Sequence, residues 1–462
     1  MSAEQLHYKK IPGVYDLTHI QDKNQQRYPF LLESTAHGSA HSRFDILFAF
    51  PQSVIKLDKT GLVFEDGQKI NNNEFLTALN RQYCREKKDL KNKKTEHLPF
   101  IGGWFFYLSY ELAQEIEPSL KLSSSNNMPL PQATAVRVPA AIIVDKKLKE
   151  TWLIAELEFE SVLSQLNDDI NHYQESDVKQ IVKTTHINEE IESRYYDSLK
   201  KIHQYIVDGD VFQVNLSRLW QVQVEENQSA FDIYRRLREK NPAPFSGLCF
   251  IENVAIISSS PERLFKVDKG RVETRPIAGT RPRGRSKSGS VNQNADLQRK
   301  QELISHPKER AEHVMLIDLE RNDLGRIAQP GSVTVDEFMV LETYEHVHHI
   351  VSNVSGTKRD DVLPGDIIAA VFPGGTITGC PKVRCMEIIA ELEKSPREAY
   401  TGAIGYLNRD GSMDSNILIR TMIMHEQELH IRAGAGIVID SDPIRELEET
   451  RVKAKGMLAV FE

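Results

Sequence analysis

Apolar and polar residues in the first part of the chain follow the pattern of β-strands. Short apolar or alternating runs bounded by turn residues are typical of strands, and such runs on both sides of Asp66-Gly67 predict a hairpin. A second pair of strands is expected on either side of the turn 145–147. The strand-like runs are FDILFAFP (44–51), LVFEDGQKI (62–70), the aromatic run that follows Gly102-Gly103, and AAIIVDKKLKETWLIAEL (140–157).

The second part of the chain combines helical and strand-like patterns. Tyr196, Leu199, Ile202 and Ile206 recur at helical spacing, and Asp208-Gly209 ends that run. Further helices are predicted over 296–323, 381–394 and 443–461, and strands are predicted over 211–224, 247–267, 402–424 and 427–440.

A polar stretch rich in Lys and Glu, residues 167–190, indicates a boundary. It separates an N-terminal region, 1–175, from a C-terminal region, 190–462, which we expect to be woven into one compact unit. There is no internal repeat, and the strands are not spaced by regular helices. The pattern therefore favours an α+β fold over a doubly wound parallel sheet.

Composition narrows the class of protein. The 462 residues carry a net charge of −8, which argues against nucleic acid as a partner. The N-terminus lacks an apolar leader pattern, and no apolar run approaches membrane-spanning length, so no membrane partner is expected. Four cysteines form neither a C-x-x-C pair nor a disulfide framework. We expect a cytoplasmic globular protein.

Two pairs of glutamates have the spacing that places both members on one helix face: Glu309 with Glu312, and Glu446 with Glu449. Such pairs most often belong to a solvated surface. The run around Glu312, AEHVMLIDL (311–319), is more apolar than a surface helix needs. Carboxylates that face inward from two helices suit Mg²⁺, which prefers oxygen ligands.

Several features could hold an anion. Arg420 ends an otherwise apolar strand, and Gly434 and Gly436 follow another strand, where they free backbone N–H groups. Lys453 lies four residues after a glutamate, and a plain surface pair would have the same spacing. A glycine-rich loop, 371–384, leads into a helix whose N-terminus is either an anion site or an ordinary cap.

Glu262 and His349 are the candidate proton-transfer groups, although a histidine is often purely structural. The stretch VETRPIAGTRPRG (272–284) gathers three arginines around Ala278. Together these residues predict a pocket for a small dicarboxylate that uses Mg²⁺. A metal-dependent anion-binding regulator would need the same cations and carboxylates, but neither Glu262 nor His349.

Nine motifs, in order from about Glu190 to the end of the chain, resemble those of the chorismate-utilising enzymes. This family includes anthranilate synthase component I, aminodeoxychorismate synthase component I, and the isochorismate and salicylate synthases. The motifs are SSSPERL, RPIAGTRPRG, ERAEHVMLIDLERNDLGR, VHHIVSNVSG, FPGGTITGCPKVRCMEII, GAIGYL, IRT, AGAGIVIDSDP and EETRVKAKGML. The resemblance implies a mixed α/β fold with two packed antiparallel sheets, helices around them and an active site in a cleft.

The resemblance also implies roles for particular residues. The Mg²⁺ carboxylates would be Glu312 and Glu449, with Glu309 and Glu446 nearby. The enolpyruvyl side of chorismate would be bound by Tyr406, Arg420, Gly434 and Gly436. The catalytic groups would be Glu262 as general acid, His349 close to the ring and Lys453 near the ring carboxylate. The cleft would be lined by Ala278, Gly279, Thr280 and Thr378.

The identity of the nucleophile is indicated by one substitution in a further segment, FQVNLSR (212–218). Relatives that add water carry a lysine where this chain has Gln213 in FQVNLSR. The resemblance therefore implies ammonia as the nucleophile. Cys249 lacks the sequence context of an amidotransferase nucleophile. Ammonia is thus expected from a separate glutamine amidotransferase subunit.

Two products are possible for an ammonia-using member. Several segments and the chain length are most similar to aminodeoxychorismate synthase component I, which aminates chorismate on the route to 4-aminobenzoate and folate. Many such enzymes have a lysine nucleophile in PIKGT, whereas this chain has Ala278 in PIAGT, as anthranilate synthases do. Anthranilate synthase component I, an enzyme of tryptophan biosynthesis, is the alternative.

A second ligand site is implied by two N-terminal and central segments. Leu32, Glu33 and Ser34 resemble the tryptophan pocket of component I proteins. The facing segment departs from the version found in feedback-inhibited anthranilate synthases; its residues are Asn241, Pro244, Phe245 and Ser246. We expect a bound structural tryptophan or a vestigial pocket, with weak inhibition or none.

Overall fold

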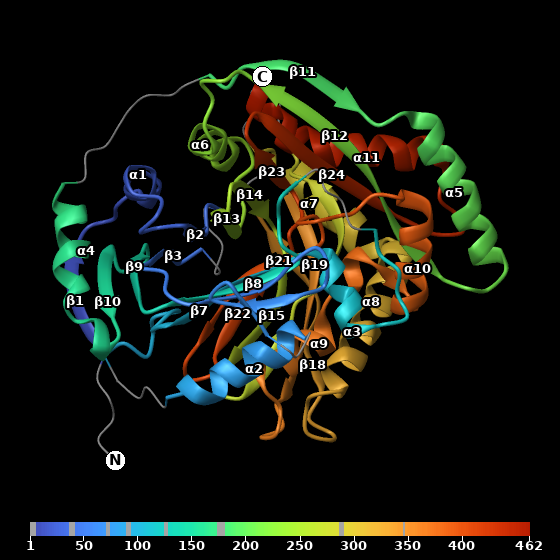
Figure 1. The fold of residues 1–462 in the computed structure, drawn as a ribbon. Coiled ribbons are helices and arrows are strands. Elements are labelled where there is room, and N and C mark those ends of the chain that lie inside the picture. The colour runs from blue at the N-terminus through green and yellow to red at the C-terminus, as the bar shows by residue number, and fades with distance from the viewer. Residues whose placement is uncertain are drawn as a thin grey trace.

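The computed structural model describes residues 6–36, 42–70, 74–88, 94–123, 128–172, 181–285, 291–344 and 347–462. These residues form two antiparallel sheets, each with twelve strands in the described part of the chain, and helices around them (Figure 1). The expected α+β class with two packed sheets is confirmed. Part of the predicted boundary at 167–190, residues 173–180, lies outside the described residues.

The first sheet contains strands from both ends of the chain. Its order along the sheet is β1 (His7–Pro12), β10 (Glu150–Ala155), β9 (Ala140–Asp145), β3 (Phe44–Ala49), β2 (Phe30–Glu33), β13 (Phe245–Ile251), β14 (Val254–Ser260), β23 (Thr421–His425), β24 (Glu428–Ile437), β12 (Gln213–Val224) and β11 (Thr184–Glu189), with β20 (Gly379–Cys380) paired to β12.

The second sheet also mixes N-terminal and C-terminal strands. Its order is β17 (Ile277–Pro282), β19 (Val347–Thr357), β16 (Arg271–Thr274), β15 (Arg263–Asp268), β22 (Met413–Asn416), β21 (Ala403–Asn408), β7 (Gly103–Leu108), β8 (Ala133–Val138), β4 (Val54–Leu57), β5 (Val63–Glu65) and β6 (Gln68–Lys69), with β18 (Thr334–Thr343) paired to β19. The hairpin predicted at Asp66-Gly67 joins β5 to β6.

Aromatic side chains fill the space between the two sheets. Phe30 of the first sheet stacks on Phe105 of the second with ring centroids 3.9 Å apart, and Phe48 meets the edge of the same ring. Both sheets thus bury one face in a shared apolar core, because the inward positions of their strands alternate with outward ones.

Helices cover the outer faces of the sheets. Figure 1 shows α11 lying along β12 and β24, and α8 and α10 on the same side of the molecule. The helices are α1 (Leu17–Lys23), α2 (Phe75–Glu86), α3 (Ala113–Ile116), α4 (Val162–Asn171), α5 (Glu192–Val207), α6 (Ala230–Lys240), α7 (Gln293–Ser305), α8 (Pro307–Gly325), α9 (Pro364–Val371), α10 (Lys382–Glu393) and α11 (Pro443–Leu458).

The helical run predicted over 296–323 is two helices. It divides at His306, whose side chain accepts a hydrogen bond from the N–H of Glu309 and so caps α8. Pro307 occupies the first position of α8, where its missing N–H costs nothing. This break directs the first turn of α8 towards the second sheet, where it contacts β17.

Candidate active site

The candidate site lies where β23 and β24 separate. β24 pairs with β12 over almost its whole length, but it pairs with β23 only through residues 428–431. Arg420 immediately precedes β23, and Gly434 and Gly436 lie on the part of β24 beyond that pairing. One edge of β24 is therefore open beside Arg420.

The backbone of β24 turns donors towards this open edge. The carbonyl oxygen of Gly434 accepts a hydrogen bond from Lys453 Nζ at 3.0 Å, so it points away from β12. In a strand, the N–H and C=O of one residue point to the same edge, and residues two apart share that edge. The N–H groups of Gly434 and Gly436 therefore face the opening.

Arg420 supplies fixed positive charge at the same place. Its backbone has φ of 51°, an uncommon conformation outside glycine that is often found at functional sites. Among the described residues no carboxylate lies within 4.0 Å of its guanidinium. Burial lowers the pKa of Arg420, and Glu262 opposes that shift. A half-buried guanidinium without an ion pair in this part of the chain suits an anionic ligand.

Glu262 follows β14 and is 5% exposed. Burial raises its pKa to about 7, against the opposing effects of Thr376, the Ile277 N–H, Lys453 and Arg420. The Ile277 nitrogen lies 3.4 Å from Glu262 Oε1. A carboxyl with such a pKa holds a proton near neutral pH and can release it, which is the property of a general acid.

His349 lies in β19 and is 3% exposed. Burial, with a smaller contribution from Arg420, lowers its pKa to about 4. The ring is therefore neutral at pH 7, and its Nδ1 lies 2.8 Å from Thr280 Oγ1. Ala278, 5% exposed, pairs with the neighbouring residue Ile350. The stretch with three arginines thus forms a wall that carries Ala278 and Thr280.

Carboxylates gather on the other side of the opening. Glu312 Oε1 accepts a hydrogen bond from Gln213 Nε2 at 3.0 Å, and Glu449 pairs with Lys453 at 2.8 Å. Burial raises the pKa of Glu312 and of Glu446, and the negative charge of Glu449 adds to both shifts. These carboxylates are close enough to repel one another across α8 and α11.

The donor set is compatible with Mg²⁺. The described residues contain no cluster of three or more His, Cys, Asp or Glu side chains arranged to hold a metal. However, Mg²⁺ commonly takes one or two protein carboxylates and keeps water or substrate oxygens for its other positions. Two mutually repelling carboxylates, Glu312 and Glu449, fit that requirement.

Four of the residues considered in the sequence analysis do not join this group in the expected way. Glu309 pairs with Arg281 at 2.6 Å. The Thr378 hydroxyl donates to the carbonyl of Gly374 at 2.9 Å and so braces the loop before α10. Lys382, at the predicted helix N-terminus, pairs with Asp323 at 2.5 Å; that pair replaces the simple anion site that the glycine-rich loop suggested.

Tyr406 is the fourth and clearest displacement. Its ring lies against Phe48 and Phe100 in the core between the sheets, and its neighbouring charges are Asp414 and Arg263. It lines a cavity whose walls do not include Arg420. Tyr400, which the sequence reasoning missed, lies at the site instead: a Cβ built on Gly434 would come 2.8 Å from its hydroxyl.

The predicted tryptophan pocket is a separate cavity of about 1080 Å³. Six of the seven predicted residues line it, together with Tyr406: Leu32, Glu33, Ser34, Pro244, Phe245 and Ser246. Asn241 does not line it, and its carbonyl accepts a hydrogen bond from Ser259. The pairing of Ser246 with Glu33 brings the two segments together.

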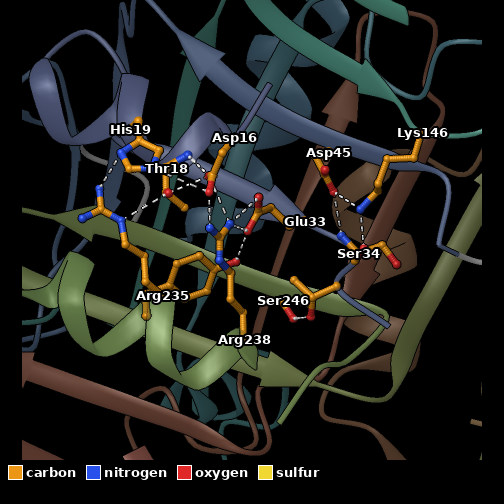
Figure 2. Close-up of polar contacts among 12 residues, drawn as sticks. Asp16, Thr18, His19, Glu33, Ser34, Asp45, Lys146, Arg235, Arg238 and Ser246 are labelled. Carbon is orange, nitrogen blue, oxygen red and sulfur yellow. Dashed lines mark hydrogen bonds and ion pairs between the residues drawn. The ribbon is translucent and has the colours of Figure 1, made fainter. Parts of the chain in front are cut away.

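Polar residues behind this cavity are already paired, as Figure 2 shows. The Glu33 carboxylate accepts hydrogen bonds from Tyr234 at 2.7 Å and Arg238 at 3.4 Å, and burial raises its pKa to about 7. On the other side, Asp45 accepts from the Ser34 N–H and from Lys146. The Ser34 hydroxyl itself is buried and has no partner among the described residues.

The fold and the geometry together place positive charge and outward N–H groups beside a buried carboxyl with a raised pKa, an arrangement that suits a small polyanion. A family model for chorismate binding enzymes matches residues 29–459. The chain belongs to the chorismate binding enzyme family. Within the described residues, no helix is long and apolar enough to cross a membrane.

Relatives with two different names resemble the chain to a similar degree. It is 40% identical over 381 residues to an anthranilate synthase component I-like protein of Synechocystis, covering 82% of this chain and 76% of that protein. It is 37% identical over 474 residues to aminodeoxychorismate synthase component 1 of Bacillus subtilis, covering 98% and 96%. The crystal structure of anthranilate synthase component I from Streptococcus pneumoniae matches with a TM-score of 0.80 at 31% identity, covering 91% and 93%.

Proposed function

We propose that the chain is the component I subunit of an aminodeoxychorismate synthase, a transferase that converts chorismate and ammonia to 4-amino-4-deoxychorismate for 4-aminobenzoate and folate. The observation that carries the chorismate part is the arrangement of Arg420, which has no carboxylate partner among the described residues, and the outward N–H groups of Gly434 and Gly436 beside buried Glu262.

The substrate's two carboxylates divide between the two halves of the site. Arg420 and the N–H groups of Gly434 and Gly436 bind the enolpyruvyl carboxylate, because they offer positive charge and donors that point outward. Glu312 and Glu449, with Glu446 nearby, would hold Mg²⁺, which would supply Lewis-acid chemistry by attracting the ring carboxylate and withdrawing electron density from the ring. Lys453 adds positive charge between the two halves.

Glu262 donates a proton to the C4 hydroxyl as it leaves, so that water departs rather than hydroxide. With a pKa of about 7, a large fraction of this carboxyl carries a proton near neutral pH and can donate it to the leaving hydroxyl. His349 is neutral, and its imidazole lies within hydrogen-bond distance of the Thr280 hydroxyl. In this proposal the imidazole positions the ring of chorismate without adding charge. The new ammonium group loses one proton, and the overall reaction replaces a hydroxyl with an amine.

Ammonia is the nucleophile in this proposal because Gln213 stands where water-adding relatives have a lysine. Its side-chain amide is bound to Glu312 and cannot act as a base. Burial raises the pKa of Cys249 far above its usual value, which argues against a built-in amidotransferase nucleophile at that residue. A separate glutamine amidotransferase subunit therefore supplies the ammonia.

Ala278 favours the second candidate function, anthranilate synthase component I. The residue is buried and carries no nucleophile, so amination proceeds without a lysine adduct. The relative with the higher identity of the two reported above also has an anthranilate-type name. In that reaction, ammonia adds at C2 and pyruvate leaves.

Replacing Glu262 by Gln tests whether the site is catalytic. The amide keeps the size of the side chain but cannot donate the proton, so chorismate binding should persist while turnover falls by about 100-fold or more. Calorimetric binding and steady-state rates would be measured on the same preparation. Equal turnover in the variant would show that Glu262 is not the proton donor, whereas chorismate binding without any turnover in the wild type would favour an anion-binding regulator.

The large cavity is proposed to bind tryptophan as a structural ligand with weak inhibition or none. The Ser34 hydroxyl, which has no hydrogen-bond partner in the part of the chain that the structure describes, and the apolar side chains of Leu32 and Phe245 suit an amphipathic amino acid. Glu33 is already paired with Arg238, which weakens its attraction for the ligand's ammonium group. Abolition of activity by saturating tryptophan would contradict this proposal.

A further inference from the structure

Arg281 and Glu309 join the active-site wall to the helix that carries Glu312. Arg281 Nη2 lies 2.6 Å from Glu309 Oε1, and the side chains are 25% and 15% exposed. Arg281 Nη1 also donates to the carbonyl of Thr280 at 2.9 Å. The guanidinium is therefore fixed at both ends, which makes this contact stronger than an exposed ion pair.

Gly279 provides the space that this contact needs. Its φ of +74° is a conformation that favours glycine. A Cβ at this position would collide with Glu309 Oε2 and come 3.0 Å from Leu303. Because β17 has a bulge between Ala278 and Thr280, the backbone of Gly279 lies directly under the glutamate. The loop and the first turn of α8 thus interlock.

Glu309 and Glu312 have different surroundings although they lie one turn apart. Glu312 contacts Gln213 and is influenced by Glu449, Lys453 and Lys308. Glu309 contacts Arg281 and Gly279, on the side of the wall. Helical spacing alone predicts that Glu309 and Glu312 both face the metal site. The ion pair with Arg281 instead holds Glu309 against β17.

We propose that Arg281 is a positioning residue that captures Glu309, keeps this carboxylate out of the metal site and fastens β17 to α8. This inference rests on the proposed Mg²⁺ site at Glu312 and Glu449. Its consequence is a site with moderate negative charge that depends on the substrate's carboxylate to complete metal binding. With Glu309 released, a further carboxylate becomes available to the cation.

The test is a titration with Mn²⁺ alone, followed by electron paramagnetic resonance of the free ion, on the full chain. Arg281→Gln should tighten Mn²⁺ binding by about fivefold, because one more carboxylate reaches the cation. Glu309→Gln should change the affinity by less than about twofold, and the double variant should return to the wild-type value. Glu312→Gln should weaken binding by about tenfold or more.

Arg283→Gln is the matched control, since Arg283 lies in the same loop but pairs with Asp296. It should leave Mn²⁺ affinity unchanged. A loss of affinity in Glu309→Gln as large as that in Glu312→Gln would overturn the inference, and so would an unchanged affinity in Arg281→Gln.

Thermal unfolding separates this inference from the proposed metal site. If Glu312→Gln leaves Mn²⁺ binding unaltered, the metal site is wrong, and the Arg281–Glu309 contact is then judged by melting temperature. Arg281→Gln and Glu309→Gln should each lower the melting temperature, and the double variant should melt no lower than the less stable single variant. Fully additive losses would show that the two residues do not act together.

Discussion

Thr280 and His349 face each other across two strands, with Thr280 Oγ1 2.8 Å from His349 Nδ1. The bulge at Gly279 produces this pairing, because it advances β17 by two residues while β19 advances by one. Without the bulge, Thr280 would stand opposite a different residue. The hydroxyl therefore sets the orientation of a buried neutral ring beside the proposed substrate.

Removing that hydroxyl should impair turnover more than binding. Thr280→Val is expected to lower kcat by about tenfold with little change in KM, because a misoriented ring costs positioning rather than charge. Thr280→Ser keeps the hydroxyl and should restore most of the rate. Steady-state kinetics of the two variants would show the difference; equal rates in Thr280→Val and the wild type would remove His349 from the mechanism.

The pKa of Glu262 predicts a loss of activity above neutral pH. Since this pKa is about 7, the fraction of protonated Glu262, and with it kcat/KM, should fall as the pH rises through 7. A rate profile from pH 6 to 9 at constant ionic strength tests this. A rate that is flat across pH 7 would show that Glu262 is not the proton donor.

Glu262 should also make stability depend on pH. Its pKa is raised from 4.5 to about 7 in the folded chain, so the folded state binds more protons between these values. Its contribution to stability is therefore complete below pH 4.5 and is lost as the pH rises through 7. The melting temperature of Glu262→Gln should consequently fall less than that of the wild type between pH 5 and 8, and parallel curves would contradict the assignment.

The open edge of β24 is tested by adding a methyl group. In Gly434→Ala the new Cβ would lie 2.8 Å from the Leu216 carbonyl and from the Tyr400 hydroxyl, so the strand must shift and its N–H groups move. We expect chorismate affinity to fall by about tenfold, the size of losing one good hydrogen bond to a charged group. Gly325→Ala, with open space around the Cβ, is the control and should bind normally.

Ala278→Lys tests whether residue 278, in the stretch 272–284, faces the proposed substrate. The position is buried and lies two residues from Thr280, so a lysine there would reach the site. We expect a change in rate or product distribution with the fold retained, measured by product chromatography and circular dichroism. Loss of folded protein would show that Ala278 is packed against its neighbours rather than facing substrate.

Much of the site could be predicted from sequence because its residues sit in long motifs of β12, β24, α8 and α11. The exceptions have physical causes. Tyr400 and Tyr406 lie only six residues apart in the sequence. Because side chains alternate between the two faces of β21, Tyr406 points into the core between the sheets. Glu309 shares a helix face with Glu312, but an arginine from β17, distant in sequence, captures it. Neither outcome is visible in local spacing.

Some helices also lacked a usable sequence signal. The first turn of α2 contains no acidic residue, and the side chain of its N-cap residue, Glu74, makes no capping hydrogen bond. Its first N–H groups are instead bound by Glu115, forty residues further along the chain. The helix α9 is short and apolar on most sides, so its sequence lacks the alternation of apolar and polar faces by which a helix is recognised. Tertiary contacts stabilise both helices, as is usual for short segments.

The product formed from chorismate tests the central proposal most directly. The purified chain would be incubated with chorismate, Mg²⁺ and an ammonium salt, and the products identified by chromatography and mass spectrometry. The proposed function predicts 4-amino-4-deoxychorismate, with pyruvate released only after a lyase is added. Anthranilate and pyruvate formed without a lyase would contradict it and establish the alternative reaction.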